Sequence, residues 1–98
     1  MKIRGSFVPN SSASSFSILK IGLSEYQKNQ IYNHIETAEQ MTKLGLNVDF
    51  GYVSEDERWS VSETEEYVLV STGMDNFDMH EFLKVIGVDE TNILYEVD

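Results

Sequence analysis

Residues 24–45, SEYQKNQIYNHIETAEQMTKLG, carry the clearest helix signal in the chain. Ser24 is a favourable N-cap, and Gln27 three residues later completes a capping box. Four apolar residues then recur at the spacing of one helix face: Ile31, Ile35, Ala38 and Met41. Gly45 follows where a left-handed C-cap is favoured, and Leu46 is placed to contact Met41 behind it. The stretch therefore predicts a helix over residues 24–44.

Strand patterns lie on both sides of this helix. Six segments have the alternation or the β-branched and aromatic composition of strands: 2–8, 16–21, 46–52, 59–62, 67–70 and 93–95. The run at 67–70 is continuously apolar, which is typical of a central strand or of one covered on both faces. The acidic stretches 55–57 and 63–65 separate these strands and are expected to form turns.

A second helix is predicted after residue 74. Asp75 or Asn76 would cap it, and Gly87 would close it. Its apolar stripe is formed by Met79, Phe82, Leu83 and Ile86.

The predicted order is β-α-β-β-β-α-β, with the 2–8 strand in front. We expect an α+β fold in which a small antiparallel or mixed sheet of four to six strands carries two helices on one face. A split βαβ sandwich is the nearest simple template. The 98 residues fit a single domain, 1–98, with residues 1–15 as a serine-rich N-terminal arm or edge strand.

Charge is unevenly distributed along the chain. Residues 1–48 hold five cations against three acids, whereas residues 49–98 hold fourteen acids against Arg58 and Lys84, and the total is −10. An acidic surface disfavours direct binding to nucleic acid and to anionic membranes, and it favours a basic partner. The alternative, that the acidity serves solubility alone, stays open.

The acidic turns and nearby aromatic residues form the predicted partner-binding surface. Its residues are Tyr32, Glu55, Asp56, Glu57, Trp59, Glu63, Glu65 and Glu66. Tyr32 lies off the apolar stripe of the first helix, so we expect it to be exposed. Trp59 lies on a short strand between the acidic turns. It is either the centre of the core or an interface anchor.

Motifs for catalysis or for a cofactor are missing from the sequence. There is no cysteine, which excludes disulfides, thiolate zinc sites and a cysteine nucleophile, and which favours the cytoplasm. His34 and His80 lack the spacing of metal ligands, so we expect ordinary surface or boundary histidines. No EF-hand, nucleophile elbow, Walker loop or dinucleotide fingerprint is present. These observations predict a binding protein with no enzymatic activity, no cofactor and no metal.

No segment has the length and hydropathy of a membrane span. The N-terminus carries two positive charges without an apolar run behind them, so we expect no signal peptide. Both observations agree with a cytoplasmic protein that does not bind membranes.

Residues 5–16, GSFVPNSSASSF, form the least generic stretch. It resembles an N-terminal segment, roughly G-F-V-S-N-S-S-S-S-S-F, shared by small proteins of tailed bacteriophages and some bacteria. This chain differs from that pattern in the inserted Ser6, in Pro9 and in Ala13. The resemblance implies a phage-type accessory protein, and it carries no functional residues with it.

These observations predict a small acidic accessory protein that binds and modulates a host protein in the host cytoplasm, with inhibition as the expected form of modulation. In one version the acidic surface imitates nucleic acid, so that the partner is a nucleic-acid-binding protein. Two alternatives remain: a domain that binds a small ligand or a metal, and a minor structural or self-assembling component.

Overall fold

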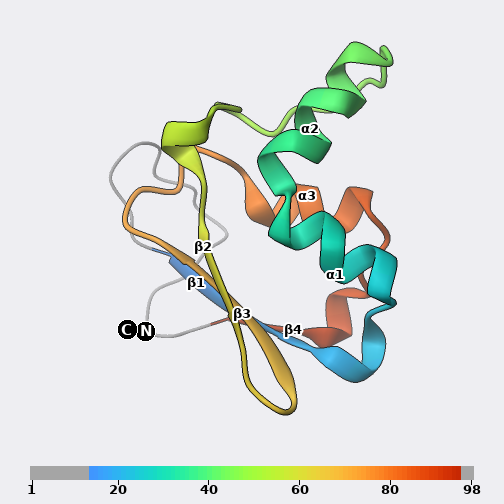
Figure 1. The fold of residues 1–98 in the computed structure, drawn as a ribbon, viewed down its shortest axis with the longest axis vertical. Coiled ribbons are helices and arrows are strands. Elements are labelled where there is room, and N and C mark those ends of the chain that lie inside the picture. Colours follow the sequence, from blue (N-terminus) through green and yellow to red (C-terminus); the bar gives the residue numbers. More distant parts are fainter. Residues whose placement is uncertain (1–13, 96–98) are drawn as a thin grey trace.

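Four segments form the strands of an antiparallel sheet, and α-helices pack on one side of it (Figure 1). The computed structural model describes residues 14–95. Within that range the strands are β1 (Ser14–Leu19), β2 (Ser60–Glu63), β3 (Tyr67–Thr72) and β4 (Ile93–Tyr95). The helices are α1 (Glu25–Tyr32), α2 (His34–Lys43) and α3 (Met79–Val85). Short 3-10 turns are η1 (Lys20–Gly22), η2 (Glu55–Glu57) and η3 (Glu90–Asn92). The predicted α+β class is confirmed.

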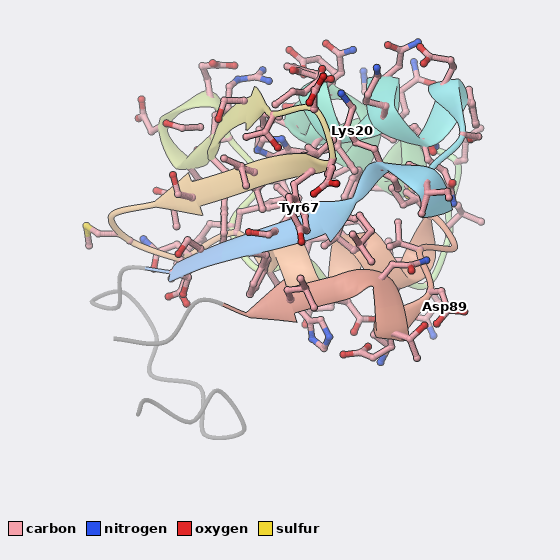
Figure 2. The ribbon with its side chains drawn as sticks, turned by 90° about the horizontal axis from the view of Figure 1, so that it is seen from below. Lys20, Tyr67 and Asp89 are labelled. Atoms are coloured by element: carbon pink, nitrogen blue, oxygen red, sulfur yellow. The ribbon has the colours of Figure 1, made fainter. Side chains whose placement is uncertain are left out.

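The strands lie in the order β2-β3-β1-β4, and each is antiparallel to its neighbour. Figure 2 shows β3, β1 and β4 side by side, with Tyr67 on β3 next to the end of β1. Because β1 and β2 are both antiparallel to β3, they run parallel to each other with β3 between them. This is the arrangement of a split βαβ unit.

The core lies between the sheet and the helices. Phe16 and Ile18 of β1 and Val68 and Val70 of β3 point to this side and are buried. The helices contribute a second set of buried residues: Ile31, Ile35, Ala38, Met79, Phe82 and Leu83. The apolar residues that alternate along the strands therefore pack against the apolar residues that recur at helical spacing, and together they form one core layer.

The first helix is shorter than predicted, because it breaks at Asn33. The capping box of Ser24 and Gln27 forms as expected. Asn33 has φ −111° and ψ 40°, which ends α1, and its carbonyl accepts the first hydrogen bond of α2, from the Thr37 N–H. The predicted C-cap is also confirmed: Gly45 has φ +80°, and the Leu46 N–H donates to the Met41 carbonyl.

The prediction of a strand at 46–52 is wrong. The segment forms one isolated bridge, between Gly51 and Phe77, in place of a strand. Phe50 is buried, but Leu46 and Tyr52 at the two ends of the alternating pattern are exposed. Gly51 has φ +75°, and an added Cβ there would lie 2.4 Å from the Asn76 carbonyl oxygen. This turn in the backbone interrupts the extended conformation that a strand requires.

The second helix begins later than predicted. Asp78, not Asp75 or Asn76, is its N-cap, and its Oδ1 accepts the Glu81 N–H. Asp75 is buried and accepts a 2.6 Å hydrogen bond from the Ser14 hydroxyl of β1. Gly87, with φ +92°, closes the helix as expected.

The predicted strand at 2–8 and most of the serine-rich arm at 1–15 lie outside the described residues. Ser14 and Ser15 belong to β1, where they pair with Thr72 and Ser71 of β3. The last two positions of the predicted arm are therefore part of the central sheet.

Candidate functional site

The two acidic turns lie at opposite ends of β2, an edge strand of the sheet (Figure 1). η2, which contains Glu55, Asp56 and Glu57, precedes β2, and the turn with Glu65 and Glu66 follows it. A strand of four residues spans about 13 Å. The acids therefore form two groups separated by the length of β2.

Glu63, at the end of β2, is held by three groups. The Tyr32 hydroxyl donates a 2.6 Å hydrogen bond to Oε2, and the Nζ atoms of Lys20 and Lys28 lie 2.9 Å and 3.6 Å from Oε1. Figure 2 labels Lys20, which also donates to the Thr64 carbonyl in the β2–β3 turn. The Tyr32 hydrogen bond, followed by that of Lys20, lowers the pKa of Glu63 to about 2. Glu63 and Tyr32 thus bind each other and fasten α1 to β2.

Arg58 is the centre of a second ion-pair cluster. Its Nε and Nη2 donate to both carboxylate oxygens of Glu55, at 2.6 Å and 2.7 Å, and Nη2 also contacts Glu36 of α2. Nη1 donates to the Tyr32 carbonyl. Hydrogen bonding from Arg58 lowers the pKa of Glu55 and of Glu36. Glu55 therefore stabilises the local fold and is less available to a partner.

Four of the predicted residues keep free carboxylates. Within the described range, Asp56, Glu57, Glu65 and Glu66 form no ion pair, and all but Glu57, which is half-buried, are exposed. Asp56 and Glu57 are the second and third residues of η2, and Glu65 and Glu66 lie in the turn between β2 and β3. Among the predicted acids, these four are the ones whose charge remains available for an external partner.

Trp59 is part of the core. Only 2% of its surface is exposed, its ring stacks on Phe16 with centroids 5.4 Å apart, and its Nε1–H donates to the Phe77 carbonyl. The structure thus supports the first of the two interpretations of Trp59. Its inclusion in an exposed partner surface is corrected, because a buried ring is not accessible to a partner.

His34 is fully buried, not a surface or boundary residue as expected. Its Nδ1 lies 2.7 Å from the Ile31 carbonyl oxygen, and its Nε2 lies 3.0 Å from the Trp59 backbone nitrogen. A carbonyl only accepts and an amide N–H only donates, so Nδ1 carries the proton and Nε2 accepts. Burial lowers the pKa of His34, which keeps the ring neutral. The ring joins the start of α2 to the start of β2.

A groove along α1 and α2 was not predicted. It has a volume of about 470 Å³ and also includes residue Leu46 after α2. Apolar side chains line its ends: Tyr26 at one, and Met41, Leu44 and Leu46 at the other. Amide side chains lie between them: Asn29, Gln30, Asn33 and Gln40. We call these eight residues the α1–α2 stripe.

The large apolar side chains at the two ends of the stripe are unusually exposed to solvent. Tyr26 is 73% exposed and Leu44 is 74% exposed. The sequence contained a signal for this groove, because six of its lining residues recur at intervals of three or four: Tyr26, Gln30, Asn33, Thr37, Gln40 and Leu44. Of the predicted apolar residues, Ile31, Ile35 and Ala38 are buried in the core, whereas Met41 is half-buried and lines the groove.

Among residues 14–95, no three His, Asp or Glu side chains are grouped closely enough to hold a metal ion. No helix of the described part of the chain is long and apolar enough to cross a membrane. Compared with protein-family models, curated proteins and solved structures, the chain shows no match.

Proposed function

We propose that this chain is a binding protein whose acidic turns dock on a basic surface of another protein and inhibit it. The observation that carries the proposal is the set of free carboxylates at the two ends of β2: Asp56, Glu57, Glu65 and Glu66. Fixed charges of one sign raise the rate of association with an oppositely charged partner and select against other partners.

The rigid support of these turns favours recognition over simple solubility. Arg58 fastens η2 to α2 through Glu55 and Glu36, and the Glu63 cluster fastens the other end of β2 to α1. The free acids next to these clusters are therefore presented from a fixed backbone. A surface that is ordered before binding loses less entropy when the complex forms.

The proposed setting is a phage-type accessory protein in the host cytoplasm, on the basis of the resemblance at residues 5–16. A nucleic-acid-binding host protein is one proposed target, because its basic surface would accept carboxylates in place of phosphates. We propose recognition without catalysis or a cofactor.

Affinity capture tests the proposal. The chain, immobilised at physiological salt, is exposed to bacterial lysate, and the affinity of each purified captured protein is then measured directly. Two variants of equal net charge are compared. One replaces Asp56, Glu57, Glu65 and Glu66 by their amides, and the control does the same at Glu39, Asp49, Glu81 and Glu90.

We expect the variant of the turns to lose at least about tenfold in affinity and the control to change about twofold or less. Equal losses would show that total charge alone matters, and recovery of no specific partner would contradict the proposal. Competition by duplex DNA for the captured protein would support the nucleic-acid-mimicking version, and simultaneous binding of both would exclude it.

A further inference from the structure

We propose that the α1–α2 stripe is a self-association surface, on which two copies of the chain pair antiparallel about a two-fold axis. This inference goes beyond the acidic docking function and does not depend on it. It rests on the lack of charge in the stripe, on its symmetric arrangement and on two charges at its ends.

The stripe is an uncharged region in a strongly acidic chain. The described residues contain fifteen acids and five Lys or Arg, a balance of −10. The groove is lined by a single charged residue, Glu36, and its carboxylate is bound by Arg58. Two copies repel each other through acidic faces, but along the groove the one acid that comes near its counterpart is Glu36, whose charge is balanced by Arg58. A basic partner would find no carboxylate in the stripe itself, and the one carboxylate that lines the groove, Glu36, is already bound by Arg58.

The stripe is also complementary to itself. Its apolar residues lie at the two ends and its amides lie between them. An antiparallel pair that brings Tyr26 of one copy to the partner's Leu44 also brings Gln30 to the partner's Gln40 and Asn33 to the partner's Thr37. An amide side chain donates and accepts, so identical amides can pair with each other across a two-fold axis.

Two charges next to the apolar ends fit the same arrangement. Glu25 precedes Tyr26, and Lys43 precedes Leu44. An antiparallel pair that brings Tyr26 to the partner's Leu44 also brings Glu25 near the partner's Lys43, twice per dimer. Lys43 forms no ion pair among the described residues, and Glu25 pairs with Lys28 at 3.3 Å but keeps 84% of its side chain exposed. Both groups are therefore accessible to a second copy.

The size of the stripe indicates a weak dimer. α1 and α2 contribute eight and ten residues, about 12 Å and 15 Å of helix at 1.5 Å per residue, and they are joined at the break at Asn33. A surface one helix wide buries less than the roughly 800 Å² per partner of a standard interface. We therefore expect weak association, with a dissociation constant on the order of 100 µM.

Sedimentation equilibrium of the full chain at physiological salt, from about 5 µM to 0.5 mM, tests the proposal over this range of affinity. Leu44→Glu places a negative charge in the apolar contact with the partner's Tyr26. It is expected to raise the dissociation constant at least about tenfold. Ile21→Glu is the matched control: it adds the same charge at a residue that is 93% exposed and lies outside the stripe. It should leave the dissociation constant within about twofold.

Charge reversal tests the direction of pairing. Glu25→Lys and Lys43→Glu alone should each weaken the dimer several-fold, and the double variant should restore it, because the swapped charges again face each other. Circular dichroism of each variant checks that the helices remain folded.

A chain that stays monomeric at about 0.5 mM would overturn the proposal. So would a dimer that Leu44→Glu leaves intact, or single charge reversals without rescue in the double variant. The acidic docking function is measured separately by affinity capture, so failure of either proposal leaves the other distinguishable.

Discussion

Arg58 and Trp59 are neighbours in sequence, and both connect β2 to the junction of α1 and α2, but in opposite environments. Arg58 binds Glu55, Glu36 and the Tyr32 carbonyl at the surface. Trp59 donates its backbone N–H to His34 and its ring N–H to the Phe77 carbonyl in the core. If Arg58 loses its partners, water can hydrogen-bond to its guanidinium in their place. Water cannot reach the buried N–H groups of Trp59.

This difference indicates which connection holds the fold. An exposed ion pair contributes about 0 to 1 kcal/mol, since its charges are well solvated in the unfolded chain. A buried donor without its acceptor costs about 1 to 3 kcal/mol, and the loss of a large core side chain costs more. The buried contacts of Trp59 and His34 should therefore dominate stability, although the Arg58 cluster contains more charged groups.

The largest effect is expected at Trp59. Trp59→Ala should lower the free energy of unfolding by about 3 to 5 kcal/mol, because it leaves a cavity beside Phe16. Trp59→Phe keeps an aromatic ring but removes the donor to Phe77, so its loss should be smaller. Denaturant unfolding measures both. A loss below about 1 kcal/mol for Trp59→Ala would contradict its place in the core.

The next effect is expected at His34. His34→Phe retains a ring of similar volume but leaves the Trp59 N–H and the Ile31 carbonyl without their partner, which should cost about 1 to 3 kcal/mol. His34→Gln is the matched variant, because an amide can still donate and accept. A His34→Phe variant that is more stable than His34→Gln would show that ring packing, not hydrogen bonding, determines the role of His34.

The pH dependence of stability separates the two environments further. The native pKa of His34 is lowered by burial, whereas the unfolded histidine titrates near 6.5. The unfolded state then binds more protons, so the free energy of unfolding should fall as the pH drops below about 6.5 and should stay level above it. His34→Gln should remove this slope, and a slope that persists in the variant would refute the assignment.

The carboxylates act in a lower pH range. Glu63 has a native pKa of about 2, below its unfolded value of about 4.3, so its contribution is present above the unfolded value. That contribution is lost as the pH falls through the native value. Glu63→Gln should therefore flatten the stability profile between these two values and leave the slope near pH 6.5 unchanged. The free energy of unfolding, measured with urea at a series of pH values, separates the contribution of His34 from that of Glu63.

The smallest effect is expected at Arg58. Arg58→Gln should cost about 1 kcal/mol or less, and the difference from the wild type should shrink in high salt. A thermal unfolding series with increasing salt measures this. A loss comparable to that of Trp59→Ala would mean that the surface cluster, not the core, fixes the position of β2.

Much of the fold could be predicted because its signals are local. The Ser24 capping box, the helix ends at Gly45 and Gly87 and a strand at 67–70, which the structure extends to Thr72, follow from neighbouring residues. The helix break at Asn33 did not follow from local signals, because the apolar stripe continues through it. It accompanies the contact between His34 and Trp59, which are 25 residues apart in sequence.

The candidate site was predicted less well than the fold. Asp56, Glu57, Glu65 and Glu66 are placed as the acidic turns suggested, since charged residues at turns face water. Glu55 and Glu63 instead hold ion pairs within the chain, and the exposed Tyr26 and Leu44 were not predicted. Exposure depends on what another element covers, and the pattern of a single element does not contain that information.

The sequence by itself determined the α+β class, the Ser24 capping box, the helix ends at Gly45 and Gly87 and the uneven charge, because these depend on spacing, capping and composition. Only the tertiary structure decided that residues 46–52 form no strand and that Asp75 contacts Ser14 instead of capping a helix. It also decided that Trp59 lies in the core. The physical reason is the same in each case. A short polar or apolar segment has several local conformations of similar free energy, and contacts with residues distant in sequence select one of them.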